Sequence, residues 1–214
     1  MSRAEVAAAY DVRAEEYVAG LGSVARLPSQ DRATVVAWRD ATSGRLLDAG
    51  CGPGHWSDVL TDGGRRPVLG VDATARFLVS ARRRFPHVDL VLGDLAALPV
   101  PAASVGGVLA WYSLIHTPPA DLPALLTELA RVLVPGGSLL LGFVDGEAGV
   151  PFDHAVVTAH HWSGAALGGL LEDAGFVVER VASRQDPGAR RRHGELVATL
   201  AATEVRDGGV TAPP

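Results

Sequence analysis

The 214-residue chain contains no lysine, one cysteine and one methionine, and it has no long run of apolar residues. All 19 basic residues are therefore arginine, and with 24 acidic residues the formal net charge is −5. Proteins that bind nucleic acid without sequence preference are as a rule strongly basic, so this balance argues against a nucleic-acid partner. No segment approaches the roughly 20 apolar residues that a transmembrane helix needs, so no membrane partner is expected.

The scarcity of cysteine also limits the chemistry. The lone Cys51 cannot form an intramolecular disulfide, and no group of cysteine and histidine has the spacing of a zinc site. The pairs Asp153-His154 and His160-His161 are adjacent residues rather than ligands one helical turn apart. The N-terminus lacks the apolar segment of a secretory signal. We therefore expect a cytoplasmic protein without a metal.

The residues that are present fit a single globular domain, with 48% hydrophobic and 20% charged residues. Short, nearly continuously apolar segments predict strands of a parallel sheet buried on both faces. These strands are Arg45–Ala49, Pro67–Val71, Val88–Leu92, Val105–Ala110 and Ser138–Val144, and two later strands are Phe176–Val181 and Glu195–Leu200. Helices are predicted near His55–Thr61, Thr74–Arg84, Asp121–Leu133 and Ser163–Ala174, the third ending at Pro135-Gly136-Gly137. This alternation predicts an α/β protein with a doubly wound, Rossmann-like sheet.

Three segments lie outside this pattern. Residues 1–42 predict N-terminal helices that form a cap, although they would serve a homodimer equally well. Residues 145–162 form an unusually long connection, which is typical of a lid over a binding site. The Gly/Pro-rich residues 205–214 predict a flexible tail, which leaves residues 43–204 as the main domain.

The segment Leu47–Gly54 (Leu-Asp-Ala-Gly-Cys-Gly-Pro-Gly) places three glycines at alternate positions directly after the first predicted strand. Glycine lets a loop pass close to a ligand, and we expect a Cβ at Gly50, Gly52 or Gly54 to occupy the ligand's space. Two cofactors suit such a loop. One is a dinucleotide bound by a G-x-G-x-x-G motif, and the other is S-adenosylmethionine.

Residues further along the chain favour S-adenosylmethionine. His55 stands where the dinucleotide motif requires its third glycine. Asp72 ends the second strand, where a carboxylate can accept hydrogen bonds from both hydroxyls of a ribose. Asp94 follows the third strand and is suited to accept a hydrogen bond from the adenine amine, an acid that dinucleotide-binding folds do not require.

Five motifs in this order resemble the class I S-adenosylmethionine-dependent methyltransferases, specifically the small-molecule, type 11-like group. The motifs are Leu47–Gly54, Gly70–Asp72, Gly93–Pro99, Trp111–His116 and Arg131–Gly137, and the resemblance covers residues 45–145 most closely. It implies a seven-stranded sheet with six parallel strands and an antiparallel last strand. It also implies S-adenosyl-L-methionine as cofactor and S-adenosyl-L-homocysteine as product.

The resemblance implies cofactor-binding roles for ten residues. Those expected around the methionine part and the sulfonium are Asp48, Gly50, Cys51, Gly52, Trp111 and Tyr112. Those expected around the ribose and adenine are Asp72, Ala73, Asp94 and Leu95.

His116, the last residue of the motif after the fourth strand, is the candidate catalytic residue. A histidine beside the methyl group could take a proton from an oxygen or nitrogen nucleophile, since its pKa is near neutral. The alternative is that it only hydrogen-bonds and positions a ligand. The candidate substrate-binding residues are Tyr10, Tyr17, His116, His154 and His161.

The expected activity is methyl transfer to an oxygen or nitrogen of a small-molecule acceptor. Methyltransferases that modify exocyclic amines of nucleic-acid bases carry an Asn/Asp-Pro-Pro-aromatic motif after the fourth strand, and Trp111–His116 lacks it. Three alternatives remain: a biosynthetic enzyme such as a cyclase that binds the cofactor without transferring methyl, an NAD-dependent oxidoreductase, and a protein that binds the cofactor for regulation alone.

Overall fold

The computed structural model describes residues 2–202, so the predicted tail, 205–214, and the last two residues of the predicted domain lie outside the described residues. Seven strands form one sheet in the order β3-β2-β1-β4-β5-β9-β8. Their bounds are β1 (Leu46–Ala49), β2 (Val68–Asp72), β3 (Asp89–Leu92), β4 (Val105–Trp111), β5 (Leu133–Asp145), β8 (Phe176–Arg184) and β9 (Arg192–Leu200).

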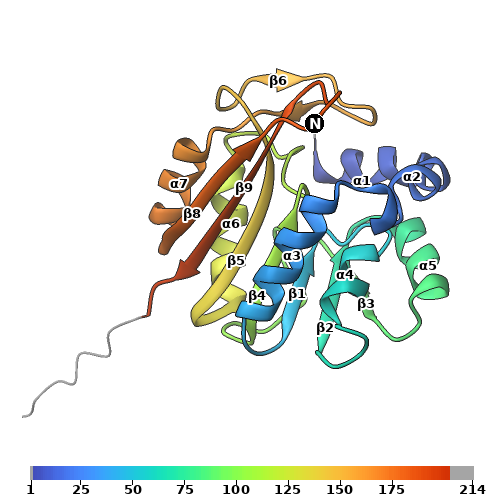
Figure 1. Ribbon diagram of the computed structural model, residues 1–214, viewed down its shortest axis with the longest axis horizontal. Helices are drawn as coiled ribbons and strands as arrows, with labels where there is room; N and C mark the ends of the chain where they lie inside the picture. The colour runs from blue at the N-terminus through green and yellow to red at the C-terminus, as the bar shows by residue number, and fades with distance from the viewer. Residues whose placement is uncertain (1, 203–214) are drawn as a thin grey trace, which may run out of the picture.

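The strand directions confirm the predicted sheet. Strand β1 pairs in parallel with β2 and β4, and the pairs β2–β3 and β4–β5 are also parallel. Strand β9 lies between β5 and β8 and runs antiparallel to both. Six strands therefore run in one direction and the last runs against them (Figure 1). Because the parallel strands end at the same edge, the loops after β1, β2, β3 and β4 come together there.

Helices cover both faces of the sheet. On one face lie α3 (Ser29–Ala41), α4 (His55–Leu60) and α5 (Ala75–Arg84), and on the other lie α6 (Leu122–Val132) and α7 (Gly164–Asp173) (Figure 1). The apolar side of α6 is fully buried, with Leu122, Leu125 and Leu129 each at most 1% exposed. Truncating one such leucine to alanine typically costs about 2–5 kcal/mol, so this face contributes much of the core stability.

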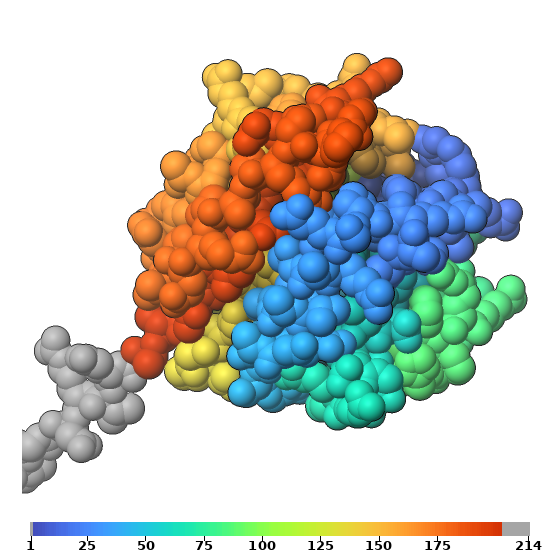
Figure 2. Space-filling model, in the orientation of Figure 1, coloured from blue at the N-terminus to red at the C-terminus, as the bar shows by residue number. Residues whose placement is uncertain are grey.

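Two N-terminal helices, α1 (Arg3–Val12) and α2 (Ala14–Leu21), precede α3 and lie beside the edge of the sheet where the parallel strands end. Ser2 and Glu5 form a capping box that starts α1. The space-filling view shows these helices between α5 and the segment around residue 155 (Figure 2). Two hydrogen bonds hold them there: the backbone N–H of Arg76 donates to Asp11, and the Arg13 guanidinium donates to the carbonyl of Ala155.

Two predicted segments differ in detail from the structure. Residues 145–162 are not an open loop, because β6 (Pro151–Phe152) and β7 (Ala159–His160) pair there as a small antiparallel ribbon. Strand β5 begins at Leu133 rather than Ser138, so the predicted helix stop lies inside a strand. A register shift opposite Val105 and Gly107 accommodates these residues. Within the described residues, no helix is long and apolar enough to cross a membrane.

Candidate cofactor and substrate site

A cavity of about 780 Å³ lies at the carboxyl ends of β1, β2 and β4. Its walls come from the glycine loop, the segment after β4, helices α1 and α2, residues 186–191 of the β8–β9 connection, and His193 of β9. A volume of this size is within the ~300–1,000 Å³ range of small-molecule sites. Thirteen of the predicted cofactor and substrate residues line it. Eleven of them are Gly50, Cys51, Gly52, Asp72, Ala73, Asp94, Leu95, Trp111, Tyr112, Tyr10 and Tyr17. His116 and His154 line it as well, whereas Asp48 and His161 are not among its lining residues.

The three glycines of the loop have different roles. All adopt positive φ, at +80° for Gly50, +52° for Gly52 and +79° for Gly54. A Cβ on Gly52 would meet no atom within 4 Å, so this position faces open space. A Cβ on Gly50 would lie 2.3 Å from the side chain of Ser113, and one on Gly54 would lie 2.9 Å from Ala81. The expectation that all three glycines make room for a ligand is therefore wrong for Gly50 and Gly54, where glycine permits close packing within the protein.

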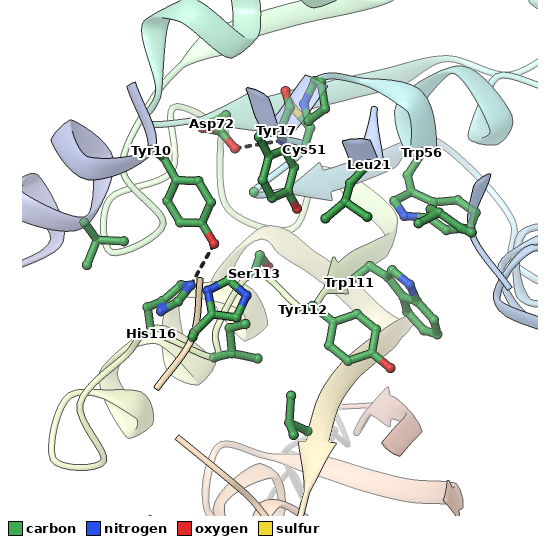
Figure 3. Close-up of a pocket in the computed structure, with 18 of the residues that line it drawn as sticks. Tyr10, Tyr17, Leu21, Cys51, Trp56, Asp72, Trp111, Tyr112, Ser113 and His116 are labelled. Carbon is green, nitrogen blue, oxygen red and sulfur yellow. Dashed lines mark hydrogen bonds between the residues drawn. The ribbon is translucent and has the colours of Figure 1, made fainter. Parts of the chain in front are cut away.

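Asp72 holds the glycine loop in place. Its carboxylate, labelled in Figure 3, faces the glycine loop. It accepts hydrogen bonds from the backbone N–H groups of Gly52, at 2.8 Å, and Thr74, at 2.7 Å. Burial raises the pKa of Asp72, although the two backbone donors favour its charged form. A carboxylate has about four acceptor positions, so this arrangement leaves capacity for hydroxyl donors from a ligand.

Asp94, which is predicted to bind the adenine, is more exposed than Asp72. Asp94 forms an ion pair with Arg3 of α1 at 3.0 Å, and both side chains are nearly half exposed. Its carboxylate also accepts a hydrogen bond from the backbone N–H of Ala96. Helix α1 thus contacts the acid that follows β3, and the N-terminal segment closes this end of the cavity.

Asp48 lies beneath the loop rather than in the cavity. Its side chain is 2% exposed and accepts a hydrogen bond of 2.6 Å from the hydroxyl of Ser57 on α4. Burial raises the pKa of this carboxyl to about 7. The Asp48 carboxylate therefore does not face the cavity.

Two buried polar atoms in the cavity lining have no hydrogen-bond partner among residues 2–202. They are Oγ of Ser113, which follows β4, and Nδ1 of His55 at the start of α4. Buried polar groups are normally paired, so these atoms mark positions for a polar ligand. The amino-acid part of S-adenosylmethionine carries polar groups of this kind, so the residues present fit that cofactor. Sequence reasoning missed Ser113, although its place in the motif after β4 was a usable signal.

An aromatic wall lines the other side of the cavity. Trp111 contacts Trp56 and Tyr112 edge to face, with ring centroids 6.1 and 5.3 Å apart. Tyr112 adopts a positive φ of +56°, which is uncommon for a bulky residue and is found chiefly at functional sites. Its hydroxyl is 2.8 Å from Nδ1 of His193, so the β8–β9 connection is joined to this wall.

A second aromatic group includes His116. The rings of Tyr10 and Tyr17 are 5.6 Å apart, and both pack against Phe77. The hydroxyl of Tyr10 lies 2.7 Å from Nε2 of His116 (Figure 3). Nδ1 of His116 lies 2.9 Å from the carbonyl oxygen of Thr158. Burial lowers the pKa of His116, so the ring is neutral at neutral pH.

The two histidines predicted in the 145–162 segment lie in different environments. The His154 ring packs against His116 with centroids 4.9 Å apart, and burial lowers the pKa of His154 to about 4. His161 instead packs against Phe152, with ring centroids 4.5 Å apart. His154 lies in the connection between β6 and β7 and His161 directly follows β7, and only His154 lines the cavity.

The β8–β9 connection is the part of the site that the sequence did not indicate. Arg184 forms ion pairs with Asp31 of α3 and, at 2.8 Å, with Asp186. The Asp31 and Arg184 side chains are only 6% and 15% exposed. This buried network fixes residues 186–191 against the cavity. Within the described chain, no group of three His, Cys, Asp or Glu side chains is placed to hold a metal ion.

The sheet order, the antiparallel β9 and the glycine loop held by an acid after β2 define the class I, Rossmann-like methyltransferase fold. Residues 46–137 match the family model described as a methyltransferase domain. This part of the chain is therefore similar to a methyltransferase domain.

A probable S-adenosylmethionine-dependent methyltransferase of Mycolicibacterium smegmatis is 36% identical over 137 residues, which are 63% of this chain and 52% of that protein. The chain thus spans about half the length of this relative. Two solved structures share the fold. A [4+2]-cyclase, SpnF, has a TM-score of 0.76 at 19% identity, over 94% of this chain and 97% of that chain. A 1,6-didemethyltoxoflavin-N1-methyltransferase of Burkholderia thailandensis, crystallised with its acceptor and S-adenosylhomocysteine, has a TM-score of 0.73 at 19% identity, over 94% and 91%.

Proposed function

We propose that this protein is an S-adenosylmethionine-dependent methyltransferase that acts on an oxygen or nitrogen of a small molecule. The observation that carries the proposal is the carboxylate of Asp72, which binds the backbone of Gly52 at the point where the loop faces the open cavity. The matching family model and the Mycolicibacterium smegmatis relative support the same activity.

Each part of the cofactor has residues suited to it. Asp72 would accept hydrogen bonds from the ribose hydroxyls, and Ala73 would lie against the adenine. Asp94 and Leu95 would bind the adenine edge. The exposed backbone at Gly52, the Ser113 hydroxyl and His55 would receive the amino-acid part, with Asp48 acting through Ser57.

The cofactor supplies an activated methyl group, so the protein mainly has to align an acceptor and exclude water. Holding two reactants in attack geometry can contribute roughly 7–11 kcal/mol to the barrier reduction. Helices α1 and α2 and the ribbon of β6 and β7 enclose the cavity at the end where the strands finish, which suits both tasks. A cavity of this size, with several aromatic side chains in its walls, fits a small molecule better than a nucleic acid.

The test is a methyl-transfer assay with S-adenosylmethionine labelled in the methyl group, run after mass spectrometry of any ligand that copurifies. Label in a small-molecule product supports the proposal. Turnover of an acceptor with the cofactor kept intact would instead indicate a cyclase-like enzyme. Reduction of NAD in the presence of an alcohol would indicate an oxidoreductase.

A further inference from the structure

The two hydrogen bonds of His116 define which ring nitrogen carries the proton. The carbonyl oxygen of Thr158 can only accept, so Nδ1 of His116, 2.9 Å away, carries the hydrogen and donates it. In the neutral ring Nε2 then holds a lone pair. This lone pair accepts the hydrogen bond from the Tyr10 hydroxyl at 2.7 Å.

The lone pair of His116 is therefore not directly free for a substrate. Figure 3 shows the Tyr10 hydroxyl pointing at the His116 ring, and both residues line the cavity. Tyr10 is held in this position because its ring packs edge to face against His116 and Tyr17, and against Phe77. A proton that leaves a molecule in the cavity reaches Nε2 most directly through the Tyr10 oxygen.

The groups around His116 keep it available as a base. The neutral ring of His154 packs against His116 from the 145–162 segment. A positive charge on His160 would repel one on His116, which also lowers the pKa of His116. Tyr10 faces it from α1, and the cations Arg13 and Arg191 lie near His154. Among the described residues, no carboxylate is hydrogen-bonded to His116. Its ring is thus unprotonated at neutral pH and can receive a proton.

We propose that Tyr10 and His116 form a proton relay and that the acceptor is a phenol-like compound with a weakly acidic hydroxyl group. This inference rests on the proposed methyl transfer. A carboxylic acid, with a pKa near 4, has already lost its proton at neutral pH and needs no relay, whereas a phenol, with a pKa near 10, does. All three tyrosines of the chain line the cavity together with Trp56 and Trp111, and aromatic walls bind flat rings well.

The acceptor oxygen forms a bond to the methyl carbon while its own O–H bond breaks. The acceptor proton passes to the Tyr10 oxygen as the Tyr10 proton passes to Nε2 of His116. The carbon–sulfur bond breaks, and its electron pair stays on sulfur in the departing S-adenosylhomocysteine. His116 is left as an imidazolium that still donates to Thr158, and it returns its proton to water through Tyr10 after the product leaves.

The first experiment separates this inference from the proposed function. S-adenosylhomocysteine binding is measured by calorimetry, and its absence would count against the proposed function itself. The protein is then given labelled cofactor with matched acceptors: catechol and 2-naphthol, benzoate and 2-naphthoate, benzylamine and 2-naphthylmethylamine. Methylation of a phenol but not of the matched carboxylates is expected. Methylation of carboxylates or amines alone, or of none of these while S-adenosylhomocysteine binds, overturns the phenol assignment.

The second experiment tests the relay with Tyr10→Phe and His116→Gln. Since general acid–base catalysis contributes about 10²–10⁴-fold, His116→Gln should lower kcat by about 100-fold or more. Tyr10→Phe should lower kcat at least tenfold. The control is Tyr17→Phe, which removes a hydroxyl from the same aromatic group but not from the relay, and its effect on kcat should be several-fold smaller. The wild-type rate should rise with pH around a midpoint below 6.5, the usual pKa of histidine, and this dependence should vanish in His116→Gln. Full activity of Tyr10→Phe alongside an inactive His116→Gln would show that His116 acts directly.

A readout without turnover completes the test. Nitrogen-15 NMR of the histidine rings, with His116→Gln used for assignment, should show His116 protonated on Nδ1 and unprotonated on Nε2 in the S-adenosylhomocysteine complex. The opposite tautomer would leave no lone pair facing Tyr10 and would overturn the relay.

Discussion

The carboxylate of Asp72 and the backbone N–H of Gly52 are joined by a hydrogen bond of 2.8 Å. Twenty residues separate them in the sequence, yet this bond fixes the one part of the glycine loop where added atoms would meet open space. The acid therefore has two functions in our account: it shapes the loop, and it offers its remaining lone pairs to the cofactor ribose.

The glycine loop gives a prediction with a matched control. Gly52→Ala and Gly54→Ala both place a side chain at positive φ, so both carry a similar backbone cost of about 1–2 kcal/mol. The Cβ of Gly52→Ala enters the cavity, and we expect it to weaken S-adenosylhomocysteine binding at least tenfold, or about 1.4 kcal/mol. The Cβ of Gly54→Ala meets Ala81 at 2.9 Å, so that variant should lose more thermal stability. Calorimetry and thermal melts distinguish the two, and equal affinity loss in both variants would contradict the assignment of Gly52 to the ligand side.

Ser113 gives a prediction in which affinity and stability change in opposite directions. Its Oγ is buried without a partner in the described structure, so Ser113→Ala removes an unsatisfied polar atom. We expect the free protein to be as stable as the wild type or slightly more so, because an unpaired buried hydroxyl costs roughly 1–3 kcal/mol. S-adenosylhomocysteine affinity should fall about fivefold, since a net hydrogen bond contributes about 1 kcal/mol. Unchanged affinity, measured by calorimetry, would show that Ser113 does not contact the cofactor.

The buried Asp48 predicts a pH-dependent stability in the absence of cofactor. Its folded pKa of about 7 is raised above the unfolded value of 3.8. Between these values the unfolded chain has released a proton that the folded protein retains, so rising pH favours unfolding. The contribution of Asp48 is fully present below pH 4 and lost by about pH 7, at roughly 1.4 kcal/mol per pH unit within this window. Asp48→Asn should remove this part of the slope in urea titrations at pH 4.5, 5.5 and 6.5, and identical slopes in both proteins would contradict it.

The ion pair between Arg184 and Asp31 predicts a large stability change. Arg184→Met leaves the nearly buried Asp31 carboxylate without its partner, and breaking such a pair typically costs about 3–5 kcal/mol. Arg65→Met is the control, because Arg65 is 78% exposed in its pair with Asp62 and exposed pairs contribute little. Chemical unfolding should show a loss of about 3 kcal/mol for Arg184→Met and almost none for Arg65→Met. Similar values for the two would mean that the buried network does not hold the β8–β9 connection.

The sheet and most of the candidate site could be predicted because their signals are local. Strands such as Val105–Ala110 are visible as short, nearly continuously apolar segments. The acids Asp72 and Asp94 stand at the ends of such segments. The topology then requires that these strand ends meet. Tyr10 and Tyr17 could be predicted from the resemblance, and their rings meet across the break at Arg13 between α1 and α2.

What could not be predicted depends on tertiary contacts. The approach of residues 186–191 to the cavity depends on Arg184 and Asp31, which are 153 residues apart and carry no motif. The different placement of His154 and His161 follows from the pairing of β6 with β7, two-residue strands too short to leave a sequence pattern. The space around Gly50 and Gly54 is filled by Ser113 and Ala81, which lie in other parts of the chain, so the sequence around the glycines does not reveal it.

The most direct test of the account is calorimetric titration of the wild-type protein and Asp72→Asn with S-adenosylhomocysteine and, separately, with NAD. We predict one molecule of S-adenosylhomocysteine bound per wild-type chain, at least 100-fold weaker binding in Asp72→Asn with an unchanged circular dichroism spectrum, and no binding of NAD. Binding of NAD without S-adenosylhomocysteine, or equal S-adenosylhomocysteine affinity in Asp72→Asn, would contradict it.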